Sequence, residues 1–528
     1  MTDAPERPSV MELLHTVVDE GSFTSWDGPL VEVAADEGYL ATLAKARERT
    51  GLDESVLTGQ GLVHGRPVAL IGCEFAFLAG SIGVAAAERL VSAVERATAE
   101  GLPLLATTAS GGTRMQEGTT AFLQMVKISA AISAHKAAGL PYLVYLRHPT
   151  TGGVFASWGS LGHVTIAQPH ALIGFLGPRV YEALYDAPFP DGVQTAENLH
   201  RCGLLDGVIP AGGLAALIDR ALAVLMAPRQ VSVAAMVDEA IPDIDAWESV
   251  TRSRDAQRPG VRALLRYAAT DVVALNGTGE GESDPSLLLA LARFGGAPCI
   301  LLGQDRARQS SHDPLGPAAL RTARRGMRMA QELDLPLVTV IDTAGAALSP
   351  EAEEGGLAGE IARCLAELIT MRAPTVSVLL GQGSGGAALA LLPADRVIAA
   401  QHGWLSPLPP EGASAIVHRT AEKAPLMAAE QGVRSADLRA AGIVDASWPN
   451  TRTPPRKRSS SAGGWAPRWP RNSPPSSPPM PTNGLPPAGG ATGNSVCRAP
   501  GTSPYGRGVQ RGPATAPLCP CPRSLRGP

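Results

Sequence analysis

The stretches PLLATTASGG at residues 103–112 and PLVTVIDTAG at residues 336–345 share one layout: a proline, an apolar run and a closing glycine. They lie 233 residues apart. The same offset relates three further pairs, namely Pro141 and Pro374, Gly152 and Gly385, and Gly153 and Gly386. Chance among common residues would not keep one offset across two strands and two turns. The sequence therefore indicates an internal repeat at the scale of a domain.

Around each stretch, strand-like apolar runs alternate with helical segments. The pattern predicts such elements at residues 67–73, 83–100, 102–108, 121–138 and 141–146, and again at 298–303, 317–333, 335–343, 359–371, 374–380 and 395–400. Val, Ile and Leu runs separated by helices are typical of parallel βαβ units with helices outside the sheet. Residues between about 215 and 285 are predicted to be helical, with a loop at 277–281. We therefore expect an α/β protein with two such units in tandem.

Composition excludes several classes of protein. The chain has 528 residues, 45% of them hydrophobic, which is enough for two or three domains with cores. Residues 451–528 hold eleven Arg or Lys and no Asp or Glu, so the rest has 34 basic and 49 acidic residues, the wrong balance for binding nucleic acid. Isolated cysteines, a polar N-terminus and the lack of an apolar run of ~20 residues predict a cytoplasmic protein outside the membrane.

Glycine-rich turns follow strands in both halves, at residues 110–118 and 150–153 and at 342–346 and 381–387. Glycine lets the chain turn tightly and lets a ligand approach backbone N–H groups. Two such turns side by side could aim two N–H donors at one oxygen and so form an oxyanion hole. Each turn alone is also explained as an ordinary connection between strand and helix. Four turns at matched spacing favour the oxyanion holes.

These turns carry a resemblance to a known family. ASGGTRMQEG at 109–118 resembles the ASGGARMQEG signature of the β subunit of bacterial acetyl-CoA carboxylase carboxyltransferase, and PTTGGV at 149–154 and ALIGFLGPRV at 171–180 are similar to later segments of that subunit. DTAGA at 342–346, the turn at 383–390 and PEGA at 410–413 resemble its α subunit. The chain looks like fused β-like and α-like subunits over about 60–446. The resemblance implies two crotonase-like (ClpP/crotonase) ββα-superhelix domains in tandem.

The resemblance divides the chain into four regions. We expect an N-terminal helical extension at 1–60, a β-subunit-like domain on the acyl-CoA side at 61–250, an α-subunit-like domain on the carboxybiotin side at 251–450, and a Pro/Arg-rich tail at 451–528. The tail is expected to be disordered because it cannot bury enough apolar surface. The α-like pattern stops at 444–446, and we interpret the tail as the product of a shifted reading frame. Residues 1–72 lack the four cysteines of the family's zinc ribbon, so no zinc is expected.

The resemblance also implies a function, that of the carboxyltransferase component of acetyl-CoA or acyl-CoA carboxylase. Such an enzyme transfers the carboxyl group of carboxybiotin, held on a separate carrier protein, to acetyl-CoA and gives malonyl-CoA for fatty acid biosynthesis. The thioester carbonyl would be held by Gly111, Gly112, Gly152 and Gly153, and the biotin carbonyl by Gly345, Gly385, Gly386 and Ala387. Expected partners are biotin carboxyl carrier protein, biotin carboxylase and at least one further copy of this chain.

Five more residues are candidates for binding CoA or biotin: Arg114, Gly177, Arg179, Glu411 and Gly412. Arg179 follows Gly177-Pro178 and could contact the CoA phosphates. Arg114, like Glu117, could instead form an ion pair that shapes its turn. His148 either lines the site or is a hydrogen-bonded loop histidine. These alternatives stay open on the sequence alone.

Two departures from the family pattern affect the biotin side. Ala344 replaces the proline of the family's DTPGA turn, and Ala347 stands where an aromatic residue is usual. Two other functions are therefore kept. One is a crotonase-type CoA hydratase or decarboxylase with a carboxylate base, and the other is a catalytically weak subunit that scaffolds a carboxylase complex. Acyl-CoA-dependent decarboxylation of a carboxybiotinylated carrier would distinguish them.

Overall fold

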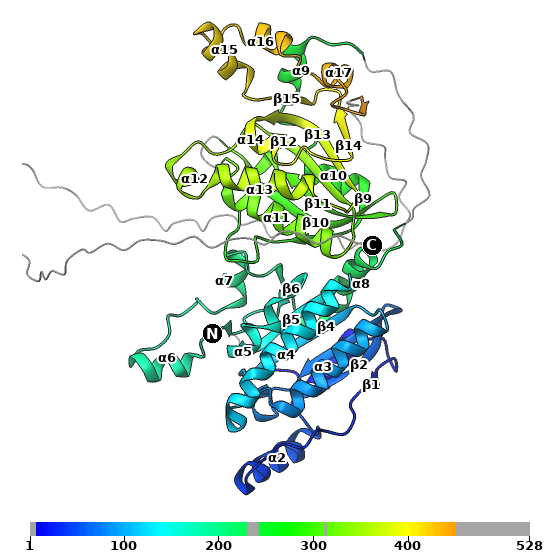
Figure 1. The fold of residues 1–528 in the computed structure, drawn as a ribbon, viewed down its shortest axis with the longest axis vertical. Coiled ribbons are helices and arrows are strands. Elements are labelled where there is room, and N and C mark those ends of the chain that lie inside the picture. Colours follow the sequence, from blue (N-terminus) through cyan, green and yellow to red (C-terminus); the bar gives the residue numbers. More distant parts are fainter. Residues whose placement is uncertain (1–6, 230–241, 311–313, 450–528) are drawn as a thin grey trace, which may run out of the picture. The chain divides into compact units, whose positions relative to one another are not determined.

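A computed structural model of the chain describes residues 7–229, 242–310 and 314–449. These residues form two eight-stranded sheets with helices packed against them (Figure 1). The predicted disordered tail at 451–528 lies outside the described residues. Within the described ranges, no helix is both long and apolar enough to span a bilayer. In the same ranges, no three His, Cys, Asp or Glu side chains are grouped so that they could hold a metal ion.

The first sheet has the strand order β1-β2-β3-β4-β5-β6-β8, with β7 paired to β5. Its strands are β1 (Thr24–Ser25), β2 (Val56–Val63), β3 (Arg66–Cys73), β4 (Leu104–Ser110), β5 (Tyr142–Thr151), β6 (Val164–Ala167), β7 (Ile173–Gly174) and β8 (Gly207–Val208). β1 to β3 pair antiparallel and the later strands parallel. β4 is buried along its whole length, as expected of a central parallel strand.

The second sheet repeats this plan, in the order β16-β14-β13-β12-β11-β10-β9 with β15 paired to β13. Its strands are β9 (Ala269–Leu275), β10 (Leu287–Phe294), β11 (Ala297–Gln304), β12 (Leu337–Thr343), β13 (Thr375–Ser384), β14 (Arg396–Ala400), β15 (Trp404–Ser406) and β16 (Ala446–Trp448). β9 to β11 pair antiparallel, and the remaining strands pair parallel. The prediction of two parallel α/β units in tandem is confirmed.

The offset of 233 residues also holds for strand pairing. The Cα partners that show it are Leu104 with Tyr142 and Ser110 with Thr150 in the first sheet, and Leu337 with Thr375 and Thr343 with Gly383 in the second. In each sheet the last of these pairs follows a shift in register. Both halves therefore end their two central strands in the same irregular way, at the point where the glycine turns begin.

The helices fill the connections. They are α1 (Val10–Val17), α2 (Glu37–Thr50), α3 (Val84–Ala99), α4 (Gly118–Ala137), α5 (Gly152–Phe155), α6 (Pro178–Tyr185), α7 (Ala196–Arg201), α8 (Leu214–Leu225), α9 (Ala246–Ser253), α10 (Val261–Ala268), α11 (Pro317–Glu332), α12 (Pro350–Glu354), α13 (Leu357–Ile369), α14 (Gly385–Leu389), α15 (Pro410–His418), α16 (Ala424–Glu430) and α17 (Ser435–Ala440). β9 lies where only helices were predicted, at 215–285. The expected domain border at 250/251 falls inside α9, which packs against α16 and β13 of the second half.

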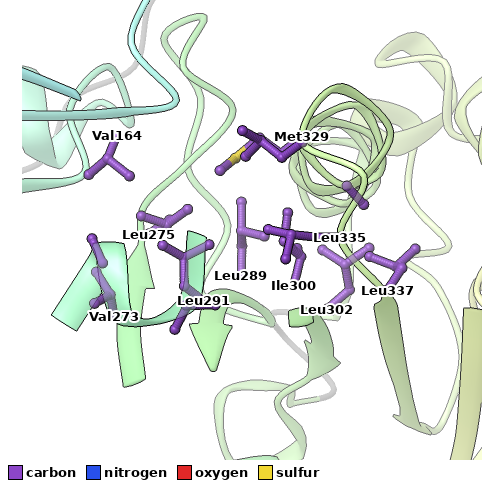
Figure 2. Close-up of a cluster of buried hydrophobic side chains, with 14 of the residues drawn as sticks. Val164, Val273, Leu275, Leu289, Leu291, Ile300, Leu302, Met329, Leu335 and Leu337 are labelled. Atoms are coloured by element: carbon purple, nitrogen blue, oxygen red, sulfur yellow. The ribbon is translucent and has the colours of Figure 1, made fainter. Parts of the chain in front are cut away.

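The core of the second half forms where β10 and β11 meet α11. Figure 2 shows Leu289 and Leu291 of β10 and Ile300 and Leu302 of β11 directed toward the same cluster as Met329 of α11. Each such side chain, when fully buried, contributes about 1.5–3 kcal/mol. α8 contacts β2 of the first sheet and β9 to β11 of the second, so the same apolar cluster includes residues of both halves.

Candidate active site

In the first half, the turns after β4 and β5 lie against each other. Gly112 has a φ of +104°, and a Cβ atom on it would lie only 3.1 Å from the Gly153 nitrogen. Gly152 has a φ of +62°, and its Cβ would lie 3.3 Å from the Gly111 carbonyl oxygen. Side chains rarely adopt such φ angles, so glycine is needed here for both conformation and close approach. The four glycines that were predicted as one site are neighbours.

Backbone hydrogen bonds show which N–H groups the turns use internally. Gly111 donates to Ala79 O (2.8 Å), Gly112 to Ser110 Oγ (3.0 Å) and Gly152 to Phe175 O (3.0 Å). In the structure these three N–H groups are bonded to other parts of the chain and shape the turns. The N–H of Gly153 belongs to the first turn of α5, where a helix offers no acceptor.

A second donor follows Gly112 in the chain. Thr113 forms a parallel bridge with Ile82, in which Ile82 N–H donates to Gly112 O and Arg114 N–H donates to Ile82 O. Because successive N–H groups of an extended chain point to opposite sides, the Thr113 N–H points away from Ile82. Sequence reasoning missed Thr113, since the bridge that sets this direction involves Ile82, a residue 31 positions earlier outside the named strands. Its only signal was its place directly after the glycine pair.

The second half has the same pair of turns. Gly385, with a φ of +67°, and Gly386 open α14 as their counterparts open α5 (Figure 1). Gly386 packs on α13, and a Cβ on it would lie 2.7 Å from Ile361 Cδ1. The Gly345 N–H donates to Thr343 Oγ1 (3.2 Å), so it too is used inside its own turn. Gly386 is therefore the better candidate for a donor.

Ala346 and Ala387 complete the second half of the site. Ala346 forms a parallel bridge with Leu315, as Thr113 does with Ile82, so its N–H is directed in the equivalent way. Ala387 is fully buried in α14, and its carbonyl accepts a hydrogen bond from Gln304 Nε2 (2.8 Å). The turn that contains Ala344 thus keeps the same bridge as the first half without the family's proline.

Arg114 forms a buried ion pair in the structure, as one of the two alternatives for this residue anticipates. Its side chain is 1% exposed, and its guanidinium binds both carboxylate oxygens of Glu54, one at 2.9 Å, together with Ser81 O at 2.7 Å. Glu117 accepts hydrogen bonds from Tyr39 Oη and Val84 N–H. Burial and the bond to Glu117 raise the pKa of Tyr39 to about 12, so Tyr39 stays a neutral donor.

The remaining candidate binding residues are not gathered at one turn. Glu411, in α15, pairs with Arg254, whose Nε also donates to Gln382 at 3.2 Å on the strand that leads into the Gly385 turn. This pairing with Arg254 lowers the pKa of Glu411. Gly412 follows in α15, and Gly177 caps α6. The side chain of Arg179 lies outside the described part of the chain.

His148 is a hydrogen-bonded histidine within β5. Its Nδ1 accepts from Leu172 N–H (3.0 Å), and its Nε2 lies 2.9 Å from the Arg7 guanidinium. Burial and the charge of Arg7 lower its pKa to about 4. It is therefore neutral at pH 7, and its Nδ1 serves as the acceptor of the Leu172 N–H.

Known proteins are similar to this chain in sequence and in architecture. The family described as "Carboxyl transferase domain" matches residues 7–450. A probable biotin-dependent acyl-coenzyme A carboxylase beta3 subunit of Mycobacterium bovis is 64% identical over 434 residues, which cover 82% of this chain and 88% of that protein. The acetyl-coenzyme A carboxylase carboxyl transferase subunits beta/alpha of Salinispora tropica is 36% identical and covers 84% of this chain and 81% of its own length.

Solved structures support the fold. Transcarboxylase 12S with methylmalonyl-coenzyme A and methylmalonic acid bound superposes with a TM-score of 0.68 at 20% sequence identity, and the match covers 84% of this chain and 86% of that chain. At 20% identity this similarity shows that the two-sheet architecture is shared, and no more.

Proposed function

The chain belongs to the carboxyl transferase domain family, and from that premise we propose that it transfers a carboxyl group from carboxybiotin to acetyl-CoA. It is a transferase, the carboxyltransferase subunit of a biotin-dependent acyl-CoA carboxylase. One observation supports the proposed carboxyl transfer from carboxybiotin to a thioester. Each half places two neighbouring glycine turns so that each turn has one backbone N–H that its own hydrogen bonds do not use. In the first half these N–H groups belong to Thr113 and Gly153, and in the second half to Ala346 and Gly386.

Carboxyl transfer needs two such donor pairs. When the bond between the ureido nitrogen of biotin and the carboxyl carbon breaks, CO2 leaves and the electron pair stays on the ureido group, with negative charge on its oxygen. The ureido nitrogen then takes a proton from the α-carbon of the thioester, which places charge on the thioester oxygen. The resulting carbanion attacks CO2 and forms the new carbon–carbon bond. In our proposal the first half stabilises the thioester oxygen and the second half the ureido oxygen.

The buried ion pairs argue against a crotonase-type hydratase or decarboxylase. Such an enzyme needs a free carboxylate base beside the thioester. The acidic residues of the turns, Glu117 and Asp342, are both buried and both bonded to arginine or to backbone donors. With biotin itself as the proton acceptor, a transferase needs no such base.

The test is an assay with separately purified, carboxybiotinylated carrier and a panel of acyl-CoA thioesters. Acetyl-CoA should be carboxylated to malonyl-CoA, and carrier alone should lose its carboxyl group slowly. Carboxylation confined to longer acyl-CoA would reject acetyl-CoA as the substrate. Carrier that is bound without turnover would favour the scaffold, and hydration of an enoyl-CoA would favour the hydratase.

The proposal extends to partners and setting. A biotin carboxyl carrier protein and a biotin carboxylase would be separate chains, the complex would act in the cytoplasm, and malonyl-CoA would serve fatty acid biosynthesis. The names of the relatives, which are subunits of biotin-dependent or acetyl-coenzyme A carboxylases, support the role in a carboxylase complex.

We also propose that the chain self-associates through α4. Phe122, Leu123 and Val126 are 61%, 57% and 68% exposed and lie on one face of this helix, next to the Gly118 turn. A contiguous apolar face of this kind is typical of a protein interface. The transcarboxylase 12S with the same fold is a hexamer. A second copy is therefore the expected occupant.

Val126→Asp should weaken self-association by about tenfold or more, since a charge in an apolar contact costs upwards of ~1.4 kcal/mol. Light scattering or sedimentation across a dilution series measures this change. Val193→Asp, the same substitution at a half-exposed valine in the turn before α7, should leave the assembly as it is. An unchanged assembly in Val126→Asp would exclude α4 from the interface.

A further inference from the structure

We infer that Gln304 is a positioning residue that fixes the spacing of the two turns in the second half, an inference that rests on the proposed function. Gln304 is the last residue of β11 and is completely buried. Its Oε1 accepts from Asp342 N–H at 2.9 Å, and its Nε2 donates to Ala387 O at 2.8 Å. One amide thus joins the end of β12 to α14.

The chemistry of the partners fixes the orientation of this amide. A backbone N–H can only donate and a backbone carbonyl can only accept, so the oxygen of Gln304 faces Asp342 and its nitrogen faces Ala387. The first bond holds the strand that leads into the Gly345–Ala346 turn. The second holds the helix whose first turn carries the Gly386 N–H. Both donors proposed for the ureido oxygen are therefore positioned through a single side chain.

The first half lacks this link, which makes the link specific to one half. Cys73 stands at the equivalent place, because it ends β3 and pairs with the first residue of the preceding strand as Gln304 does. The Cys73 thiol contacts the backbone of Ala109, the counterpart of Asp342, but its side chain is two atoms shorter than that of glutamine, so it holds only one of the two ends. The first half uses a threonine pair instead, with Thr108 Oγ1 at 3.0 Å from Thr150 Oγ1 on the neighbouring strand.

Loss of the link should act on biotin chemistry alone. Without Gln304, the buried Asp342 N–H and Ala387 carbonyl lose their partners, and the two turns can relax away from each other. Displacement of a catalytic group by about 1 Å can cost on the order of 10²-fold in rate. The thioester side, which is held by Thr108 and Thr150, keeps its geometry.

The experiment follows carboxyl transfer from malonyl-CoA to free biotin, because this direction allows each substrate to be varied separately. Gln304→Met keeps the volume and removes both bonds. It should lower kcat roughly 10–100-fold and raise KM for biotin, with KM for malonyl-CoA unchanged. Thr150→Val, which removes the bonds of Thr150 Oγ1 to both Thr108 Oγ1 and Thr108 O, should show the opposite split. Thermal unfolding checks that each variant is folded. If Gln304→Met does not fold, the same kinetic comparison is made with Gln304→Asn, whose shorter side chain reaches only one of the two partners.

The outcomes separate this inference from the proposed function. If the unaltered chain transfers no carboxyl group to biotin, the proposed function fails. If it does so, and a folded Gln304 variant retains the biotin parameters or changes both substrates equally, only the positioning role of Gln304 is overturned.

Discussion

Gly153→Val is expected to lower kcat for carboxyl transfer by about 10²–10³-fold, the loss seen when one donor of an oxyanion hole is removed. A Cβ at position 153 would lie 3.1 Å from Thr113 Oγ1 and 3.4 Å from Met125 Cγ. Valine adds two methyl groups to this contact, so α5 has to shift and its N–H leaves its place beside Thr113. The measurement is kcat at saturating carrier and acyl-CoA.

Gly212→Val is the matched control, because no atom lies within 4 Å of the Cβ position at Gly212. That variant should keep full activity and the same unfolding midpoint. A folded Gly153→Val enzyme with normal kcat would remove Gly153 from the site.

The second half allows the same test on the other substrate. Gly386→Val places its side chain 2.7 Å or less from Ile361 Cδ1, a closer clash than at Gly153, and should inactivate as strongly. Binding of acyl-CoA should survive in this variant because the first half is untouched. The two valine variants together therefore test the proposed division of labour between the halves.

The sequence predicts the parallel strands well because they are buried on both faces. β4 and β12 each begin with an apolar run, and the prolines and glycines that flank them lie at a fixed offset. β2 was missed because it contains Gly59 and Gly61, which interrupt its apolar pattern. A Cβ on Gly59 would lie 2.4 Å from Thr24 O of β1. Close packing between neighbouring strands therefore requires small residues, and these interrupt the apolar pattern from which a strand is predicted.

The site is less predictable than the fold, since it depends on contacts between distant parts of the chain. The glycine turns are visible in the sequence, but the acceptors Ala79 and Phe175, which occupy the N–H groups of Gly111 and Gly152, are not. A sequence pattern indicates where the backbone must turn. To predict which N–H groups of the turn are already bonded, one must also know which acceptors lie nearby in the folded chain.

Arg114→Met is expected to lower the free energy of unfolding by about 3–5 kcal/mol, because it leaves a buried carboxylate without its partner. Arg114 and Glu54 are 1% and 2% exposed in their side chains. Glu54 is bound by both terminal nitrogens of the arginine, and water cannot replace these bonds at this depth. Denaturant unfolding measures the loss. Arg252→Met, at an exposed helical pair with Glu248, should cost only about 0.3–0.5 kcal/mol.

A second substitution identifies the cause. In the unaltered chain, Glu54→Gln should destabilise, since Arg114 loses the carboxylate that both of its terminal nitrogens bind and keeps only the longer contact with Glu117, at 3.5 Å. In the Arg114→Met background the same change removes an unpaired buried charge, so it should be neutral or stabilising. Equal costs in both backgrounds would show that Arg114 stabilises the turn by packing rather than by its charge. The difference between the effects of Glu54→Gln in the two backgrounds therefore decides whether Arg114 stabilises the fold through its ion pair.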